Sequence, residues 1–259
     1  MNAVLEKKYS TLDHFIERVR AAAIGDNIVK MILYGSLPRG EATPESDIDL
    51  LIIAAGDVRA VQQAVGDIAY DVMLEHNELV SPMVYCVDVL RYPISYFAYR
   101  TISQGKEVYG VDEERLRRGE SIGYLELAIE YRKLSQTILD SGGYRLVVDG
   151  AYNAAELCAK GLLLLKVKDL PSSHGGIVQK FGEVWIKSGL LPREMGRRLN
   201  KASELRNQAR YEPHANIGED EAKETLALAD QFIAALSQKL GDNQPLPSSG
   251  LQNDPQVAG

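Results

Sequence analysis

Two carboxylates at the head of an apolar segment are the side chains in this sequence best suited to chemistry. Asp47 and Asp49 flank Ile48, and the apolar run continues to Ile53. Side chains alternate between the two faces of a strand, so both carboxylates point to one side, with their Cα atoms about 7 Å apart. Such a pair suits Mg²⁺ or Mn²⁺, which take oxygen ligands and keep places for substrate phosphate. The pair therefore predicts metal-assisted phosphoryl or nucleotidyl transfer.

A glycine turn precedes the carboxylates and could hold the phosphates. Gly35 and Ser36 end the apolar run 28–34, where glycine lets backbone N–H groups approach a phosphate without a Cβ in the way. The Ser36 hydroxyl can donate to the same phosphate. A short helix starting at Leu37 would add a partial positive charge at its N-terminus. Arg39 is placed to make two parallel hydrogen bonds to a triphosphate or to leaving pyrophosphate.

The run GSLPRGEATPESDIDLLI, residues 35–52, resembles the Gly-Ser, Arg-Gly and Ser-Asp-x-Asp-Leu signature of minimal nucleotidyltransferases, a branch of the polymerase-β-like superfamily. The resemblance covers roughly residues 10–110. It implies an α/β (α+β) domain with a small mixed sheet. It also implies that Gly35 and Ser36 hold the nucleotide phosphates and that Asp47 and Asp49 ligate divalent metal.

The sequence departs from this signature in one respect. Efficient members of the superfamily usually place a third carboxylate on the following strand, where it helps to ligate the catalytic metal and can deprotonate the acceptor hydroxyl. The strand expected here, LVSPMVYCV at residues 79–87, carries none in its interior. Asp71, Glu78 and Asp88 are nearby, and we expect all three to be ordinary surface acids. Weak or metal-restricted turnover is therefore an alternative.

The elements that must position these residues follow from hydrophobic periodicity. Pro82 marks the third strand as an edge strand or a bulge. In the first domain, residues 1–112, we expect a helix up to about Ala23, strands at 28–34, 48–53 and 79–87, and a helix at 58–76.

The second half lacks strand alternation and predicts an all-α helical bundle at residues 113–240. The final residues, 241–259, hold too little apolar surface to offset the entropy of ordering, so we expect a disordered tail. The expected helices lie at 115–140, 145–167, 174–188, 191–211 and 219–240.

This helical half resembles the HEPN domain, in AYNAAELCAKGLLLL from Ala151, in the turn Ser173-His174-Gly175 and in ELRNQARYEPH from Glu204. Many HEPN domains are ribonucleases that use an Arg and a His four to six positions apart.

Here His214 lies eight positions after Arg206, and Pro213 separates it from Arg210. We therefore favour a structural Arg and a surface His over a ribonuclease site. Tyr211 resembles the tyrosine that the transferase adenylylates in two-chain HEPN toxin–antitoxin pairs, which makes it a hypothetical acceptor. Arg206, Tyr211 and His214 together form a possible second-domain site.

Charge and composition limit the class of protein. The chain has 259 residues and a net charge of −7, which argues against broad nucleic-acid binding. Its two cysteines, Cys86 and Cys158, suggest neither disulfides nor zinc ligation. We find no signal peptide and no apolar run long enough to span a membrane, so we expect a cytoplasmic protein.

We therefore expect a metal-dependent nucleotidyltransferase that uses Mg²⁺ or Mn²⁺ and transfers a nucleoside monophosphate, AMP above all, from a nucleoside triphosphate. The acceptor would be a hydroxyl on a protein or a small molecule. The alternatives are a toxin–antitoxin regulator with little or no turnover and an antibiotic-modifying transferase of the aminoglycoside type. A ribonuclease is the least favoured. The resemblance also suggests a homodimer.

Overall fold

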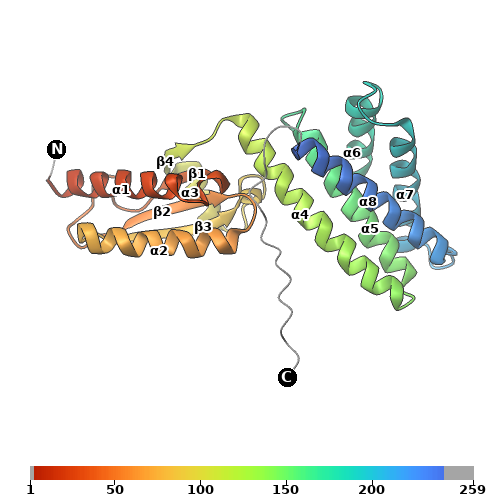
Figure 1. Ribbon diagram of the computed structural model, residues 1–259, viewed down its shortest axis with the longest axis horizontal. Coiled ribbons are helices and arrows are strands. Elements are labelled where there is room, and N and C mark those ends of the chain that lie inside the picture. Colours follow the sequence, from red (N-terminus) through yellow and green to blue (C-terminus); the bar gives the residue numbers. More distant parts are fainter. Residues whose placement is uncertain (1–2, 242–259) are drawn as a thin grey trace.

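The computed structural model describes residues 3–241. The molecule is elongated, with an α/β part at one end and a bundle of helices at the other, and the long helix α4 (Glu113–Asp140) leads from one to the other (Figure 1). The tail expected to be disordered, 241–259, lies outside the described residues from position 242 onward.

A small mixed sheet forms the centre of the α/β part, as the resemblance implied. Its strands are β1 (Ile28–Leu33), β2 (Ile48–Ala54), β3 (Val80–Cys86) and β4 (Lys106–Gly110), in the order β3-β2-β1-β4. Strand β1 is antiparallel to both β2 and β4, whereas β2 and β3 are parallel. Pro82 therefore lies on an edge strand, as expected, where its missing N–H is tolerated.

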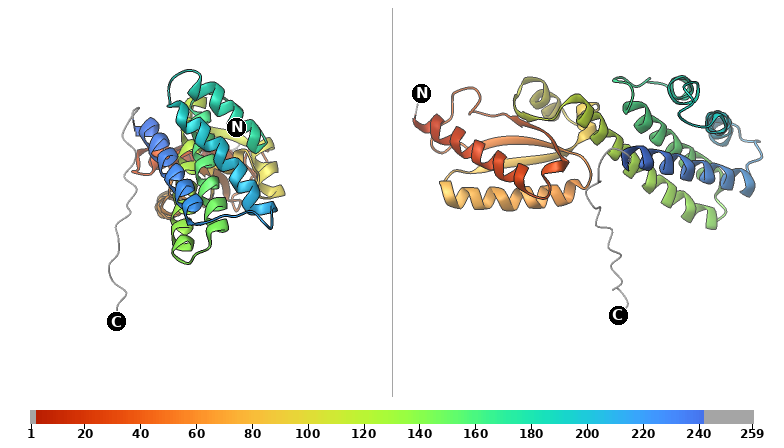
Figure 2. Two further views of the ribbon diagram at one scale, coloured as in Figure 1. Left: turned by 90° about the vertical axis from the view of Figure 1, so that its right-hand side faces the viewer. Right: turned by 45° about the horizontal axis from the view of Figure 1, so that its top comes forward.

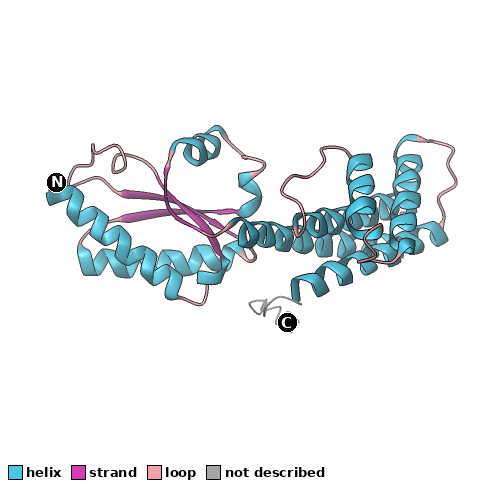
Figure 3. Cartoon of the chain, turned by 90° about the horizontal axis from the view of Figure 1, so that it is seen from above, coloured by secondary structure: helices cyan, strands magenta, loops and turns pink. Residues whose placement is uncertain are grey.

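Helices cover both faces of this sheet (Figure 3). On one face α1 (Ala3–Ala21) and α2 (Val58–His76) pack against the strands, with Leu50 and Ile52 in the shared core. On the other face Leu51 and Ile53 pack with the 3₁₀ turn Val87–Leu90 and with α3 (Tyr96–Gln104). Alternate side chains of β2 therefore belong to two different hydrophobic cores, one on each face of the sheet. A further 3₁₀ turn, Gly25–Asn27, leads into β1.

Helix α3 and strand β4 are absent from the sequence-based prediction. Both are short. Helix α3 exposes Tyr96, Phe97 and Tyr99, and it begins at Ser95, whose side chain accepts a hydrogen bond from Ala98 N–H. In β4 the two apolar residues, Val108 and Tyr109, are consecutive, and the register against β1 shifts at a bulge. Tertiary pairing, and not local pattern, defines β4.

The second half is an all-helical bundle, as predicted. After α4 come α5 (Tyr144–Leu164), α6 (His174–Phe181), a π-helical turn (Gly182–Ile186), α7 (Arg193–Tyr211) and α8 (Glu219–Gly241). Helix α5 is central, because its small side chains Ala151, Ala155 and Ala159 are fully buried and let neighbouring helices approach. Figure 2 shows α4, α5 and α8 running side by side.

The two parts are joined by more than the continuous chain. Gly119 of α4 packs so closely that a Cβ there would lie 3.2 Å from Val29 and 3.1 Å from Ala55. Arg91 donates two hydrogen bonds to the buried carboxylate of Glu120, at 2.6 and 2.9 Å. This bidentate pair anchors the end of the 3₁₀ turn to α4. Among the described residues, no helix is long and apolar enough to cross a membrane.

Candidate functional site

The turn after β1 brings Gly35 into contact with Asp49. Gly35 has a φ of +80°, and a Cβ at this position would lie 2.1 Å from the Asp49 carboxylate oxygen Oδ2. The backbone N–H of Tyr34 donates to the carbonyl oxygen of Asp49 at 3.0 Å. Only glycine combines this backbone conformation with so close an approach. The structure therefore places the predicted phosphate turn directly against one of the predicted metal ligands.

The two carboxylates interact electrostatically with each other. Asp47 lies immediately before β2, and Asp49 is the second residue of that strand. Both are half-buried, and Asp49 shares the α3 side of the sheet with Leu51. Burial, and then the charge of Asp47, raises the pKa of Asp49, while Arg39 opposes this rise. Two hard oxygen donors with excess negative charge fit a divalent cation such as Mg²⁺ or Mn²⁺.

The segment from Leu37 forms a tight turn, so the short helix considered there does not form. The N–H of Gly40 donates to Leu37 O, and the N–H of Glu41 donates to Ser36 O, both at 3.1 Å. Gly40 has a φ of +73°, which ends any helical progression, and the Leu37 side chain is buried in the core with α1 and α2. No helix dipole is therefore available here, so backbone N–H groups, the Ser36 hydroxyl and Arg39 are the donors that this turn offers.

Arg39 lies beside this turn with its side chain 59% exposed. Its Nε donates to Glu41 at 2.7 Å, and its charge reaches Asp49. The guanidinium thus keeps free N–H groups at the edge of the site, as a phosphate ligand requires.

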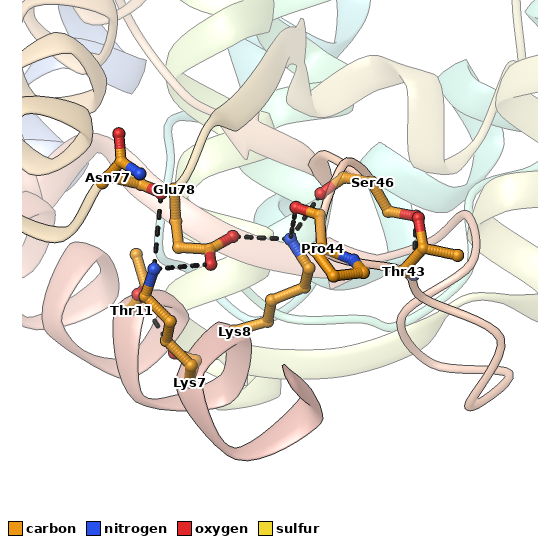
Figure 4. Close-up of polar contacts among 8 residues, drawn as sticks. All are labelled: Lys7, Lys8, Thr11, Thr43, Pro44, Ser46, Asn77 and Glu78. Carbon is orange, nitrogen blue, oxygen red and sulfur yellow. Dashed lines mark hydrogen bonds and ion pairs between the residues drawn. The ribbon is translucent and has the colours of Figure 1, made fainter. Parts of the chain in front are cut away.

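A buried lysine that the sequence analysis missed holds the loop in front of Asp47 (Figure 4). Lys8 of α1 is fully buried, and its Nζ donates to Glu78 at 2.5 Å, to Ser46 O at 2.6 Å and to Pro44 O at 3.4 Å. Lys7 pairs with the other carboxylate oxygen of Glu78 at 3.0 Å. The ammonium group therefore fixes the backbone that leads into Asp47.

A sequence signal for this lysine existed. Lys8 stands four positions before Leu12 and seven before Phe15, on the apolar stripe of α1, where a charged residue is rare unless it is paired.

None of the three acids considered above is placed to act as a third carboxylate beside Asp47 and Asp49. Asp71 pairs with Arg18 at 3.1 Å, and Asp88 lies beyond the end of β3 next to Cys86. Glu78 is only 7% exposed, so its expected place on the surface is wrong; Lys7 and Lys8 already satisfy it.

Strand β3 presents other chemistry to the site. Ser81 is the register partner of Asp49, and Met83 and Tyr85 follow on the same face by alternation. The Tyr34 hydroxyl donates to Met83 Sδ at 3.9 Å, and its pKa is raised by burial and by the charge of Asp49. The β3 residues on this face thus offer a hydroxyl, a thioether and a phenol, and no carboxylate.

The possible second-domain site is spread over different surroundings. Arg206 is buried and donates to Asp149 of α5 at 3.2 Å, where Arg210 also pairs at 2.9 Å. Tyr211, the last residue of α7, is 69% exposed, and His214 is exposed in the loop that follows. Arg206 therefore points into the bundle, while the tyrosine and the histidine face solvent.

Comparison with known proteins divides the chain into the same two parts. Residues 12–117 match the family described as nucleotidyltransferase domain, and residues 123–240 match the HEPN domain.

Similar proteins include two from Methanocaldococcus jannaschii. A candidate toxin is 29% identical over 48% of this chain and 90% of its own length, and a candidate protein adenylyltransferase is 29% identical over 38% of this chain and 94% of its own length. A spectinomycin adenyltransferase from Enterococcus faecialis aligns over 87% of this chain and 99% of its own at 13% identity, with a TM-score of 0.29, too low to inform the choice of acceptor.

Proposed function

We propose that this chain, a nucleotidyltransferase domain fused to a HEPN domain, transfers a nucleoside monophosphate, AMP above all, from a nucleoside triphosphate to a hydroxyl group. The observation that carries the proposal is the contact between Gly35 and Asp49. The turn that we propose to bind phosphate thus lies against a carboxylate whose pKa is raised by burial and by its neighbour Asp47. Such a pair gains most from a divalent cation that arrives with the nucleotide.

The chain's own residues bind and orient the substrate. The turn at Gly35 and Ser36 offers backbone N–H and hydroxyl donors to the phosphates, and Arg39 offsets the negative charge of the departing pyrophosphate. Asp47 and Asp49 would hold the divalent ion, which supplies positive charge to the reacting phosphate. The acceptor oxygen forms a bond to the α-phosphorus, the bond to pyrophosphate breaks, and the acceptor loses its proton.

Among the described residues, the site lacks an evident general base for the acceptor's proton. The β3 residues facing Asp49 include no carboxylate to take it, since Ser81 occupies the matching register position. General-base help is typically worth about 10²–10⁴-fold in rate. We therefore propose slow turnover, of the size that suits a single regulatory modification.

A toxin–antitoxin regulator is the second candidate, and it fits slow turnover. One relative is named as a toxin and another as a protein adenylyltransferase. Each of them matches less than half of this chain. Tyr211 is the acceptor that we propose in this case, because its phenol is exposed at the end of α7. Mass spectrometry after incubation with ATP and Mg²⁺ tests it, and Tyr211→Phe should abolish any added AMP.

Pyrophosphate release from ATP tests the proposed activity itself. Wild type and Asp49→Asn are compared with Mg²⁺ or Mn²⁺, and Asp13→Asn, an exposed aspartate on α1, serves as the matched control. Release that Asp49→Asn removes and Asp13→Asn retains supports the transferase. Nucleotide binding without release under either metal favours the regulator, and RNA cleavage that depends on Arg206 but not on Asp49 would support a ribonuclease instead.

A further inference from the structure

A second group of metal-binding side chains lies on the opposite side of the α/β part. His14 of α1 and the last two residues of α2, Glu75 and His76, converge so that their ligand atoms all lie within 4.8 Å of one another. His14 Nε2 is 3.5 Å from Glu75 Oε2, and the two imidazole rings stand edge to face with their centroids 4.8 Å apart. Among residues 3–241, this is the group of three or more such side chains whose ligand atoms lie close enough together to hold one ion.

We propose that His14, Glu75 and His76 bind a late first-row transition metal, with Zn²⁺ as the best match. Two imidazole nitrogens and one carboxylate oxygen suit zinc, with water in the fourth position. In a tetrahedral zinc site with bonds near 2.0–2.1 Å, neighbouring donors lie about 3.3 Å apart. The His14–Glu75 distance is already close to this value. The site is thus chemically distinct from the all-oxygen pair on β2.

The side chains are free to make the remaining adjustment. His14 is 41% exposed and Glu75 is 50% exposed, so a change of rotamer meets little packing. His76 ends α2, and the next residue, Asn77, adopts a left-handed conformation with φ 51° that closes the helix. The histidine therefore sits on a well-defined helix end, while its ring can turn.

Arg18 orients the carboxylate of this group. Its Nη1 donates to Glu75 Oε1 at 2.7 Å, and its Nη2 donates to Asp71 at 3.1 Å. One carboxylate oxygen is thus held by the guanidinium, which leaves Oε2 turned toward His14. Hydrogen bonds of this kind to a ligating carboxylate commonly position it for a metal. Arg18 is therefore a positioning residue.

The group is separated from the proposed nucleotide site by the sheet itself. Helices α1 and α2 cover the face lined by Leu50 and Ile52, whereas Asp49 faces the α3 side. A metal here would touch neither the nucleotide nor the acceptor. It would instead cross-link two helices that are far apart in the sequence, so metal binding should stabilise the folded domain.

Zinc titration of the metal-free full chain, followed by calorimetry, tests the site. The chain carries Asp47→Asn and Asp49→Asn, so that those carboxylates contribute no binding. We expect one zinc ion per chain, and a loss of affinity of at least about tenfold in His14→Gln, His76→Gln or Glu75→Gln, since removing even a supporting residue costs about 10–100-fold. His214→Gln, at an exposed histidine outside the group, is the matched control and should bind as its parent does.

Thermal unfolding separates lost ligation from lost folding. Variants of the group should unfold near the parent temperature in a chelator, while zinc should raise the midpoint of the parent and of His214→Gln only. Unchanged zinc affinity in both His14→Gln and His76→Gln would overturn the site and leave an ordinary histidine–glutamate ion pair. Equal affinity for Mg²⁺ and Zn²⁺ would also overturn it, because imidazole ligands do not favour Mg²⁺. If one histidine variant fails to fold, Glu75→Gln decides alone.

Discussion

Two groups of acidic side chains, one in each half of the chain, are arranged in opposite ways. In the bundle, Asp149 receives both Arg206 and Arg210, and buried Glu156 pairs with Lys160 at 2.9 Å and with His174. Burial raises the pKa of Glu156, but its hydrogen bonds from His174 and Lys160 outweigh this and lower it. Both acids, the half-buried Asp149 and the buried Glu156, are paired with basic side chains.

In the α/β part, by contrast, the pKa of Asp49 is raised. The main causes of this rise are burial and the charge of a second carboxylate, Asp47. Paired charge stabilises the bundle as it stands, whereas the carboxylate pair on β2, opposed only by Arg39, is the pair that we propose holds a divalent cation.

The largest expected effect comes from removing the charges of this carboxylate pair. Asp47→Asn and Asp49→Asn should each lower the rate of AMP transfer by about 10³-fold or more, since metal stabilisation supplies several kcal/mol and each 1.36 kcal/mol is tenfold. The double variant should be little worse than either single one, because both carboxylates serve one ion. Single-turnover rates with labelled ATP measure this, and effects that multiply would contradict a shared ion.

The same comparison predicts that a bundle charge matters for folding and not for transfer. We expect Arg206→Met to leave the transfer rate within about twofold and to lower the free energy of unfolding by about 1–3 kcal/mol, because Asp149 then keeps only the more exposed Arg210. Urea unfolding and the transfer assay on the same sample check both halves. If Arg206→Met lowered the transfer rate as much as Asp49→Asn does, the charges of the bundle and of β2 would not differ in role.

The α/β part also contains a buried ion pair, between Lys8 of α1 and Glu78. Lys8→Met should lower the free energy of unfolding by about 3–5 kcal/mol, because Glu78 then stays buried with only the half-exposed Lys7. Adding Glu78→Gln should recover part of this loss, which double-mutant unfolding measures. Lys7→Met is the matched control and should cost much less. Equal costs for the two lysines would show that burial of Lys8 is not decisive.

Close packing at the glycine turn should have a smaller effect on stability. Gly35→Ala forces a Cβ into the Asp49 carboxylate and strains a positive φ, whereas Gly40→Ala strains a similar φ with nothing within 4 Å of the new Cβ. Each strained φ costs of order 1–2 kcal/mol. We therefore expect both variants to lose stability but only Gly35→Ala to lose transfer activity. Equal activities would remove the reason for a glycine at position 35.

The smallest effect concerns pH. Burial alone would raise the pKa of Glu78, but hydrogen bonds from Lys8 and Lys7 outweigh it and lower the pKa below its usual value. Because the folded-state pKa is depressed, the pair contributes stability above the unfolded pKa and loses it as pH falls through the folded one. The midpoint of thermal unfolding should therefore drop on acidification below about pH 4.5. Glu78→Gln should flatten that part of the curve, and an unchanged slope would contradict the pairing.

Much of the α/β part could be predicted because its pattern is local. The apolar runs of β1, β2 and β3 and the period of α2 fall within a residue or two of their observed ends, and β1, β2 and α2 each bury a continuous face. Strand β4 could not be predicted, because it exists only through its pairing with β1. Strand alternation predicted that Asp47 and Asp49 share one face, and the structure shows that Asp49 lies on the face away from the core of α1 and α2.

The site was less predictable where it depends on contacts distant in sequence. No pattern near residue 46 shows that Lys8 holds its carbonyl group, a contact across 38 positions. The same holds for Glu78, which reads as a surface acid until α1 packs over it. The short helix considered at Leu37 does not form, because Gly40 turns the chain and the Leu37 side chain is buried in the core.

Transfer of label from ATP labelled at the α-phosphate tests the central claim most directly. With Mg²⁺ or Mn²⁺, we predict that wild type releases pyrophosphate and places an equal amount of label on protein or on an added hydroxyl acceptor. Asp49→Asn should do neither, although it folds and unfolds like wild type. Pyrophosphate release that persists undiminished in Asp49→Asn would contradict the assignment of this carboxylate, and with it the account of the site.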